Sequence, residues 1–176
     1  MKRAAIGLVL IVIFSISAAG DDGGTVDYSF IDTTSGAGAA LLADPPRLVM
    51  EEEGGAANFC DKESEFNCFT TASISFAVPR KGIQQSSWSY GGRLYCVIRS
   101  YSTMKRSPAT HDTHLIFSGV VPSCDSKIGF DTSSVYSDNH GLRLIHYQLP
   151  TGRLLELYAL DSLGFGVSPE RKRPKK

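Results

Sequence analysis

The sequence lacks several short motifs by which common enzyme classes are recognised. It has no C-x-x-C pair, so a dithiol redox centre of the usual spacing is excluded. No G-x-S-x-G surrounds any serine, and Gly164-Phe165-Gly166 is not followed by the lysine of a phosphate-binding loop. The formal net charge is zero, from 18 basic and 18 acidic residues, so the overall charge does not predict a polyanionic partner.

Long apolar runs are absent beyond the N-terminus. Lys2-Arg3 precedes an apolar stretch over residues 4–16, and the small residues Ser17-Ala18-Ala19 follow it. The stretch is shorter than the roughly 20 residues of a membrane-spanning helix, and the sequence after it is acidic rather than basic. Residues 1–19 are therefore predicted to be a cleavable export signal. The mature protein would be secreted or periplasmic, with no transmembrane segment after cleavage.

Composition divides the rest of the chain into three parts. Residues 20–47 are rich in Gly, Ala, Asp and Pro and have little periodic apolar surface, which predicts a flexible acidic tether. Residues 48–168 hold enough aromatic and aliphatic side chains for a single β-rich domain. Residues 169–176 form a basic tail that is expected to be exposed. Basic and aromatic residues do not interleave in a nucleic-acid-binding motif, so no nucleic-acid partner is expected.

The clearest strand signal is an alternating stretch that begins at Phe69. Ala72, Ile74, Phe76 and Val78 alternate with small or polar residues, as in a strand with one buried face. The proline that follows would end such a strand because it has no backbone N–H.

Two short glycine turns predict hairpins. Gly91-Gly92 separates residues 88–90 from residues 93–98, and Pro150-Thr151-Gly152 separates residues 142–149 from residues 153–160. Residues 153–160 also have a helical composition, but a strand is preferred because the segment follows a hairpin-like turn. Further candidate strands are residues 48–50, which could equally begin a helix, 114–121, 127–130 and 163–167. Together these segments predict an all-β or mainly β antiparallel domain, a small sandwich or partly open barrel.

Four cysteines in an exported chain favour disulfides over thiolate metal sites. Three pairings are possible, and the sequence-local pairing Cys60–Cys68 and Cys96–Cys124 is preferred. On the chain-entropy model these two loops would contribute roughly 2.6 and 3.6 kcal/mol to stability. The first loop, CDKESEFNC, is then a staple at the entry to the β domain, with a charged and solvated interior.

The histidines and serines give only weak indications of chemistry. His111 and His114 are the candidate metal ligands, and the other two histidines could join them, but satisfied surface or strand-end histidines are commoner. No sequence motif supports a catalytic triad built on Ser118 or Ser123, so the case for a serine hydrolase is weak. No catalytic residue, metal site or cofactor is predicted.

Aromatic and arginine side chains gather around the hairpin at Gly91-Gly92, and residues of these kinds are enriched at interface hot spots, although aromatic residues also fill cores. They predict an exported, soluble, non-catalytic binding module of the inhibitor, immunity or ligand-capture type. Its partner would be a protein or an envelope ligand. The alternative is a small exported hydrolase or metal-binding protein that uses His111 and His114. The predicted binding residues are Trp88, Tyr90, Arg93, Tyr95, Arg99 and Tyr101.

Overall fold

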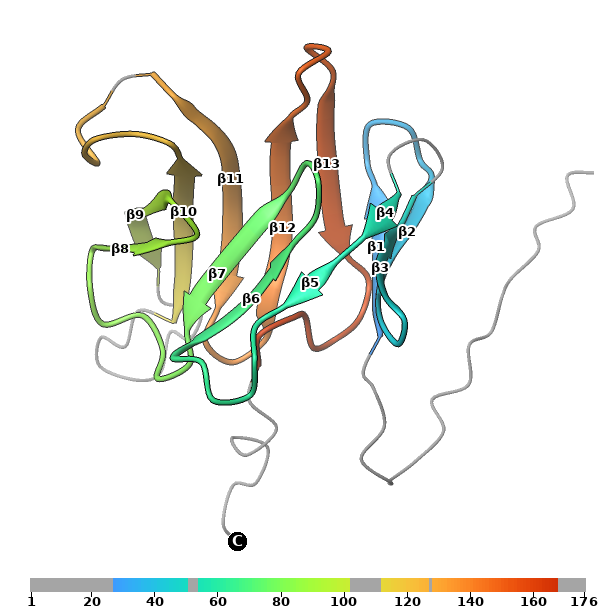
Figure 1. Cartoon of the computed structure of the whole chain (residues 1–176), viewed down its shortest axis with the longest axis horizontal. Helices are drawn as coiled ribbons and strands as arrows, with labels where there is room; N and C mark the ends of the chain where they lie inside the picture. The colour runs from blue at the N-terminus through green and yellow to red at the C-terminus, as the bar shows by residue number, and fades with distance from the viewer. Residues whose placement is uncertain (1–26, 51–53, 102–111, 127, 168–176) are drawn as a thin grey trace, which may run out of the picture.

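The computed structural model describes residues 27–50, 54–101, 112–126 and 128–167. Within these ranges the chain forms two antiparallel sheets, which confirms the predicted all-β class (Figure 1). The large sheet has ten strands in the order β4-β3-β2-β1-β13-β12-β11-β10-β9-β8, and the small sheet has the order β5-β6-β7. The strands of the large sheet are β1 (Tyr28–Asp32), β2 (Gly38–Ala43), β3 (Pro46–Val49), β4 (Gly55–Ala56), β8 (Ser87–Tyr90), β9 (Arg93–Tyr101), β10 (Thr113–Gly119), β11 (Phe130–Ser137), β12 (Gly141–Gln148) and β13 (Leu154–Ala159). Those of the small sheet are β5 (Asn58–Phe59), β6 (Phe66–Thr70) and β7 (Ser75–Pro79).

The small sheet covers one face of the large sheet, and the hydrophobic core lies between them (Figure 1). Phe76 of β7 packs against Tyr136 of β11, with ring centroids 6.2 Å apart. Phe165 packs edge-on against Phe69 of β6 at 5.1 Å. Because alternate residues of a strand point to opposite faces, the Tyr136 contact shows which side of β11 is covered, and the cross-strand pairs identify the same side on its neighbours.

Single hydrogen bonds connect the small sheet to both ends of the large sheet, but the strands of the two sheets do not pair with one another. At one end, the indole Nε1 of Trp88 in β8 donates to the carbonyl of Ala77 in β7, over 3.1 Å. At the other end, the backbone N–H of Ala57 donates to the carbonyl of Pro46 in β3. The two sheets therefore enclose the core as a sandwich that approaches a barrel but does not close.

The tether predicted over residues 20–47 is wrong for the described part of that segment. From Tyr28 onward, β1, β2 and the start of β3 belong to the same sheet as the C-terminal strands. Phe30 and Leu41 are almost fully buried, and β1 pairs with β13 through Phe30 opposite Ala159. Composition missed these strands because the partner that orders β1 lies at the far end of the chain. The predicted signal (1–19) and basic tail (169–176) lie outside the described residues.

Three of the predicted strands need correction. The run from Phe69 to Val78 is two strands, because residues 71–74 form a turn in which the backbone N–H of Thr71 donates to the carbonyl of Ile74. In the strand predicted over residues 127–130, Phe130 is the one described residue that belongs to a strand, and that strand, β11, was missed because its sequence is rich in Ser and Thr. Residues 163–167 form no edge strand. They run as turns that place Phe165 in the core.

The hairpins and the disulfides are confirmed. β8 and β9 join through Gly91 and Gly92, whose φ angles of 57° and 74° are the left-handed values of a tight hairpin turn. β12 and β13 join through the turn at Pro150-Thr151-Gly152, and residues 154–159 are a strand. Cys60–Cys68 and Cys96–Cys124 are both bonded, with Cα atoms 5.2 and 5.6 Å apart.

Candidate functional site

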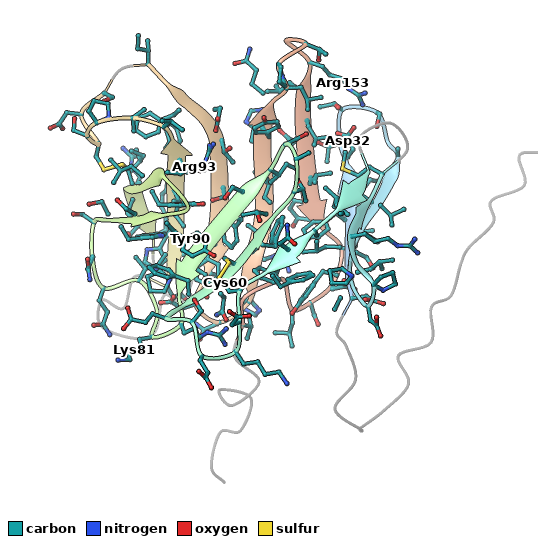
Figure 2. All side chains as sticks on the ribbon, viewed as in Figure 1. Asp32, Cys60, Lys81, Tyr90, Arg93 and Arg153 are labelled. Carbon is teal, nitrogen blue, oxygen red and sulfur yellow. A yellow bond between two sulfur atoms is a disulfide. The ribbon has the colours of Figure 1, made fainter. Side chains whose placement is uncertain are left out.

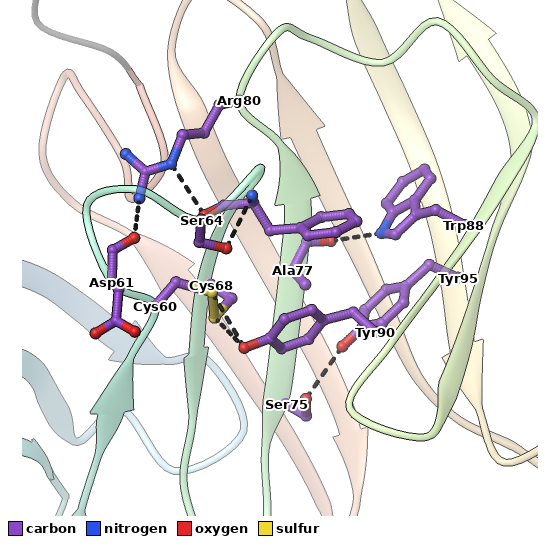
Figure 3. Close-up of a disulfide and its surroundings, with 11 residues drawn as sticks. Cys60, Asp61, Ser64, Cys68, Ser75, Ala77, Arg80, Trp88, Tyr90 and Tyr95 are labelled. Carbon is purple, nitrogen blue, oxygen red and sulfur yellow. Dashed lines mark hydrogen bonds between the residues drawn. A yellow bond between two sulfur atoms is a disulfide. The ribbon is translucent and has the colours of Figure 1, made fainter.

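The six predicted binding residues do not form one surface. Trp88 and Tyr95 lie between the sheets, where their rings stack at 5.6 Å with an interplanar angle of 3°. The Tyr95 hydroxyl lies 3.0 Å from the hydroxyl of Ser75, and Tyr95 is only 1% exposed (Figure 3). Burial raises the pKa of Tyr95 above its ordinary value. These two side chains are core, so their prediction as contact residues is wrong.

Tyr90 covers the first disulfide. Its hydroxyl lies 3.1 and 3.0 Å from the Sγ atoms of Cys60 and Cys68, and its ring packs against Phe66 at 5.3 Å (Figure 3). The staple predicted at CDKESEFNC is thus tied to the hairpin of β8 and β9. Tyr90 is therefore a structural contact of this disulfide.

The arginines of β9 point to different surroundings. Arg93 forms an ion pair with Asp131 and donates to the carbonyl of Ser118 over 3.4 Å. Arg99 and Tyr101, further along β9, are exposed. Figure 2 shows Arg93 and Tyr90 at the end of the large sheet where β8 and β9 lie. A single aromatic and arginine face around this hairpin is therefore not present.

His114 lies in a buried polar cluster of β9, β10 and the β11–β12 turn. Its Nδ1 is 2.9 Å from the hydroxyl of Ser100, and its Nε2 is 3.6 Å from Oδ2 of Asp138. Serine, histidine and aspartate are the components of a hydrolase triad. The His114 side chain is 4% exposed, however, and it points towards the small sheet, as does Tyr136 opposite it. The cluster therefore connects three segments in the interior and does not present a nucleophile to solvent.

The histidines do not assemble a metal site in the part of the chain that is described. No group of three or more His, Cys, Asp or Glu side chains with ligand geometry occurs there. His111 lies outside the described residues. His114 has the serine and aspartate neighbours given above, and His146 lies on the opposite face of the sheet.

The turn between β11 and β12 contains a short sequence that sequence reasoning did not weigh. Ser137-Asp138-Asn139 matches the S-D-N motif that accompanies S-x-x-K and K-T-G in one class of acylating serine enzymes. Ser102 and Lys105 have the S-x-x-K spacing but lie outside the described residues. Pro150-Thr151-Gly152 lacks the lysine of the third motif and lies at the other end of β12. The side-chain amide of Asn139 donates to the carboxylate of Asp112 over 3.1 Å. This contact gives Ser137-Asp138-Asn139 a structural role in the turn.

The face of the large sheet turned away from the small sheet carries a continuous apolar row. We call this side the open face and the row the apolar row. Neighbouring strands place these residues directly opposite one another, so their side chains touch across five strands. All remain partly exposed, and the tyrosine is 46% exposed. The members are Leu115 (β10), Val135 (β11), Leu144 (β12), Tyr158 (β13) and Ile31 (β1).

Charged groups beside the apolar row have partners in the protein. The guanidinium of Arg143 lies 5.7 Å from the ring centroid of Tyr158 and donates to the carbonyl of Asp161 over 2.6 Å. Glu156 accepts a hydrogen bond from the hydroxyl of Thr33, over 2.5 Å. Both groups thus have hydrogen-bonding partners in the protein, whereas Arg99, opposite Leu115 on β9, is exposed.

A hollow of about 190 Å³ lies next to the apolar row on the same sheet. Phe117, Ser133 and His146 share one cross-strand register on β10, β11 and β12, so their side chains point to the open face together. The rings of Phe117 and Phe130 meet edge to face at 5.9 Å. His146 Nε2 is buried with no hydrogen-bond partner among the described residues. The lining is completed by Asp131, Thr132, Gln148 and Leu154.

Sequence reasoning missed the apolar row and weighed His146 only as a further metal ligand, but it did select Arg99, which lies opposite Leu115 on the open face. The one available signal was the alternation of Leu115 and Phe117 with buried residues in β10. Alternation identifies two faces of a strand but not which face is covered. Only the position of the small sheet decides that.

Comparisons with protein-family models, with curated proteins and with solved structures gave no match to this chain. Among the described residues there is also no helix with the length and apolar character needed to cross a membrane.

Proposed function

We propose that the protein is an exported, non-catalytic binding module that contacts its ligand with the open face of the ten-stranded sheet. The observation that carries this proposal is the apolar row, which crosses five strands and stays partly exposed. Apolar surface left in water costs about 25 cal/mol for each Å². A contiguous exposed patch of this kind is typical of an interaction site.

The charges near the row define the kind of ligand. Arg143 and Glu156 beside the row have partners, and Asp131 at the hollow is paired with Arg93. The row itself carries no charge, so a strongly charged ligand seated on it would lose its own hydration; the exposed Arg99 lies beyond the row, opposite Leu115 on β9. The open face therefore suits a neutral ligand that combines apolar surface with hydrogen-bonding groups.

The test compares two double variants with the same number of new charges. Leu115→Lys/Leu144→Lys places two ammonium groups on the apolar row, on strands that are not direct neighbours. Val120→Lys/Ile128→Lys makes the same change at side chains that are 76% and 85% exposed in a loop. Circular dichroism and thermal unfolding establish that both variants are folded.

Retention is then measured on immobilised fractions of the producing cells: envelope protein, deproteinised polysaccharide and lipid. We expect wild type and the loop variant to be retained equally by at least one fraction. The row variant should be retained at least ~10-fold less, because desolvating two charges costs more than 1.4 kcal/mol. Equal retention of the row variant, or retention of wild type by no fraction, would refute the proposal.

A further inference from the structure

We propose that the hollow on the open face binds one neutral sugar ring of a glycan. This inference depends on the proposed function, because it assigns a ligand class to part of the same face. It starts from the polar groups of the hollow that the protein itself leaves without partners.

Three side chains of the hollow have hydrogen-bonding capacity to spare. His146 Nε2 is buried without a partner, and neither the hydroxyl of Ser133 nor the side-chain amide of Gln148 makes a hydrogen bond within the described residues. A hydroxyl and a side-chain amide each donate and accept, and a neutral imidazole has one donor and one acceptor. Sugar hydroxyls also donate and accept, so a ring carrying several of them matches this combination of hydrogen-bond donors and acceptors. A ligand with acceptors alone would use only part of it.

The charge of the hollow argues for a neutral sugar. Its carboxylate, Asp131, is paired with Arg93 and also accepts a hydrogen bond from Thr132 over 2.8 Å. Arg93, which is not part of the lining, thus balances the one carboxylate of the hollow. An acidic sugar would lie beside the Asp131 carboxylate, and an amino sugar would have to compete with Arg93 for it.

The aromatic part of the lining suits the C–H face of a sugar ring. Phe117 and Phe130 meet with an interplanar angle of 65°, so the two rings do not cover one another face to face. The positive C–H groups of a pyranose complement the negative face of an aromatic ring. Leu154, which is 44% exposed, adds apolar surface at the rim of the hollow.

Size limits the ligand and its affinity. A hollow of about 190 Å³ is smaller than the pockets that enclose drug-sized molecules, so it accommodates one ring rather than an oligosaccharide. A ligand of that size is expected to bind with a Kd on the order of 1 mM, because each non-hydrogen atom contributes little. A longer glycan would gain affinity only by extending over the apolar row.

The experiment titrates methyl glycosides into the isotope-labelled protein and follows two-dimensional NMR spectra. Neutral hexosides are expected to shift the imidazole signals of His146 and the side-chain amide of Gln148, with a Kd on the order of 1 mM. The His146→Ala variant should bind at least ~5-fold more weakly, and the Val120→Ala variant, at an exposed loop side chain that does not line the hollow, should bind as wild type does. Methyl glucuronide and methyl glucosaminide serve as charged probes.

The outcomes separate this inference from the proposed function. Absence of shifts with every neutral hexoside, preference for a charged glycoside, or unchanged affinity in His146→Ala would each overturn the sugar assignment. If the lysine substitutions on the apolar row still abolish retention while no glycoside binds the hollow, the open face remains the binding surface and only its ligand class is wrong.

Discussion

Asp32 should make the stability of this protein fall steeply in acid. It ends β1 at 4% exposure and lies beside Arg153 at the same end of the sheet (Figure 2). Its carboxylate accepts hydrogen bonds from Thr34 over 2.7 Å and from Ser35 over 2.6 Å, and Arg153 lies 3.4 Å away. Burial raises the pKa of this carboxyl, but the hydrogen bonds from Ser35 and Thr34 outweigh burial and lower it to about 2.

The size of the effect on stability follows from the shift in the pKa of Asp32. A pKa lowered from 3.8 to about 2 corresponds to about 2 kcal/mol of extra stability for the ionised form of Asp32 in the folded protein. Because the folded pKa is depressed, this contribution is fully present above the unfolded pKa. It is lost as the pH falls from about 4 through about 2.

The substitution Asp32→Asn keeps the shape of the side chain but removes its charge. At pH 7 the variant should be less stable than wild type by about 2 kcal/mol, and the difference should shrink towards zero below pH 2. Urea unfolding at several pH values measures this, with fluorescence from Trp88, the sole tryptophan, as the signal. Asp61→Asn, at an exposed carboxylate of the CDKESEFNC loop, is the control and should change stability by less than about 0.5 kcal/mol.

The comparison between variants cancels the titration of all other carboxyls. A wild-type minus Asp32→Asn difference that is the same at pH 7 and at pH 2 would show that charge is not what stabilises this turn. A difference below about 0.5 kcal/mol at pH 7 would refute the role of the carboxylate altogether.

Two further predictions concern packing and chemistry. Gly164→Ala should destabilise the protein by about 3 kcal/mol or more, because its Cβ would overlap the carbonyl oxygen of Leu142; Gly38→Ala, which meets nothing within 4 Å, should be close to neutral in the same thermal unfolding assay. A fluorophosphonate probe should leave Ser100 unmodified, because the His114 ring beside it is buried. Stoichiometric labelling of Ser100, found by peptide mass spectrometry, would instead assign a serine hydrolase.

Local signals explain which parts of the fold were predictable. The glycine pair between β8 and β9 fixes a turn, and that turn fixes which strands become neighbours. The pairings Cys60–Cys68 and Cys96–Cys124 join residues that are 8 and 28 positions apart, so neighbouring segments already hold them close. Predictions failed where the ordering contact was distant, as in β1, which pairs with β13.

The candidate site could not be predicted for the same reason. Trp88 and Tyr95 resemble interface residues in sequence, and only the presence of β7 above them makes them core. The hollow takes Phe117, Ser133 and His146 from β10, β11 and β12, and the register of these strands includes bulges at Asp131 and Arg143, which no local pattern reveals.

The sequence by itself determined the strand class, the hairpin turns and the disulfide pairs, because backbone φ preferences, alternation and short loops act between near neighbours. The tertiary structure alone decided which face of each strand is covered. It thereby placed Trp88 and Tyr95 in the core and left the apolar row and the hollow on the open face. That division arises because burial depends on the second sheet, whose position is set by contacts spread over the whole chain.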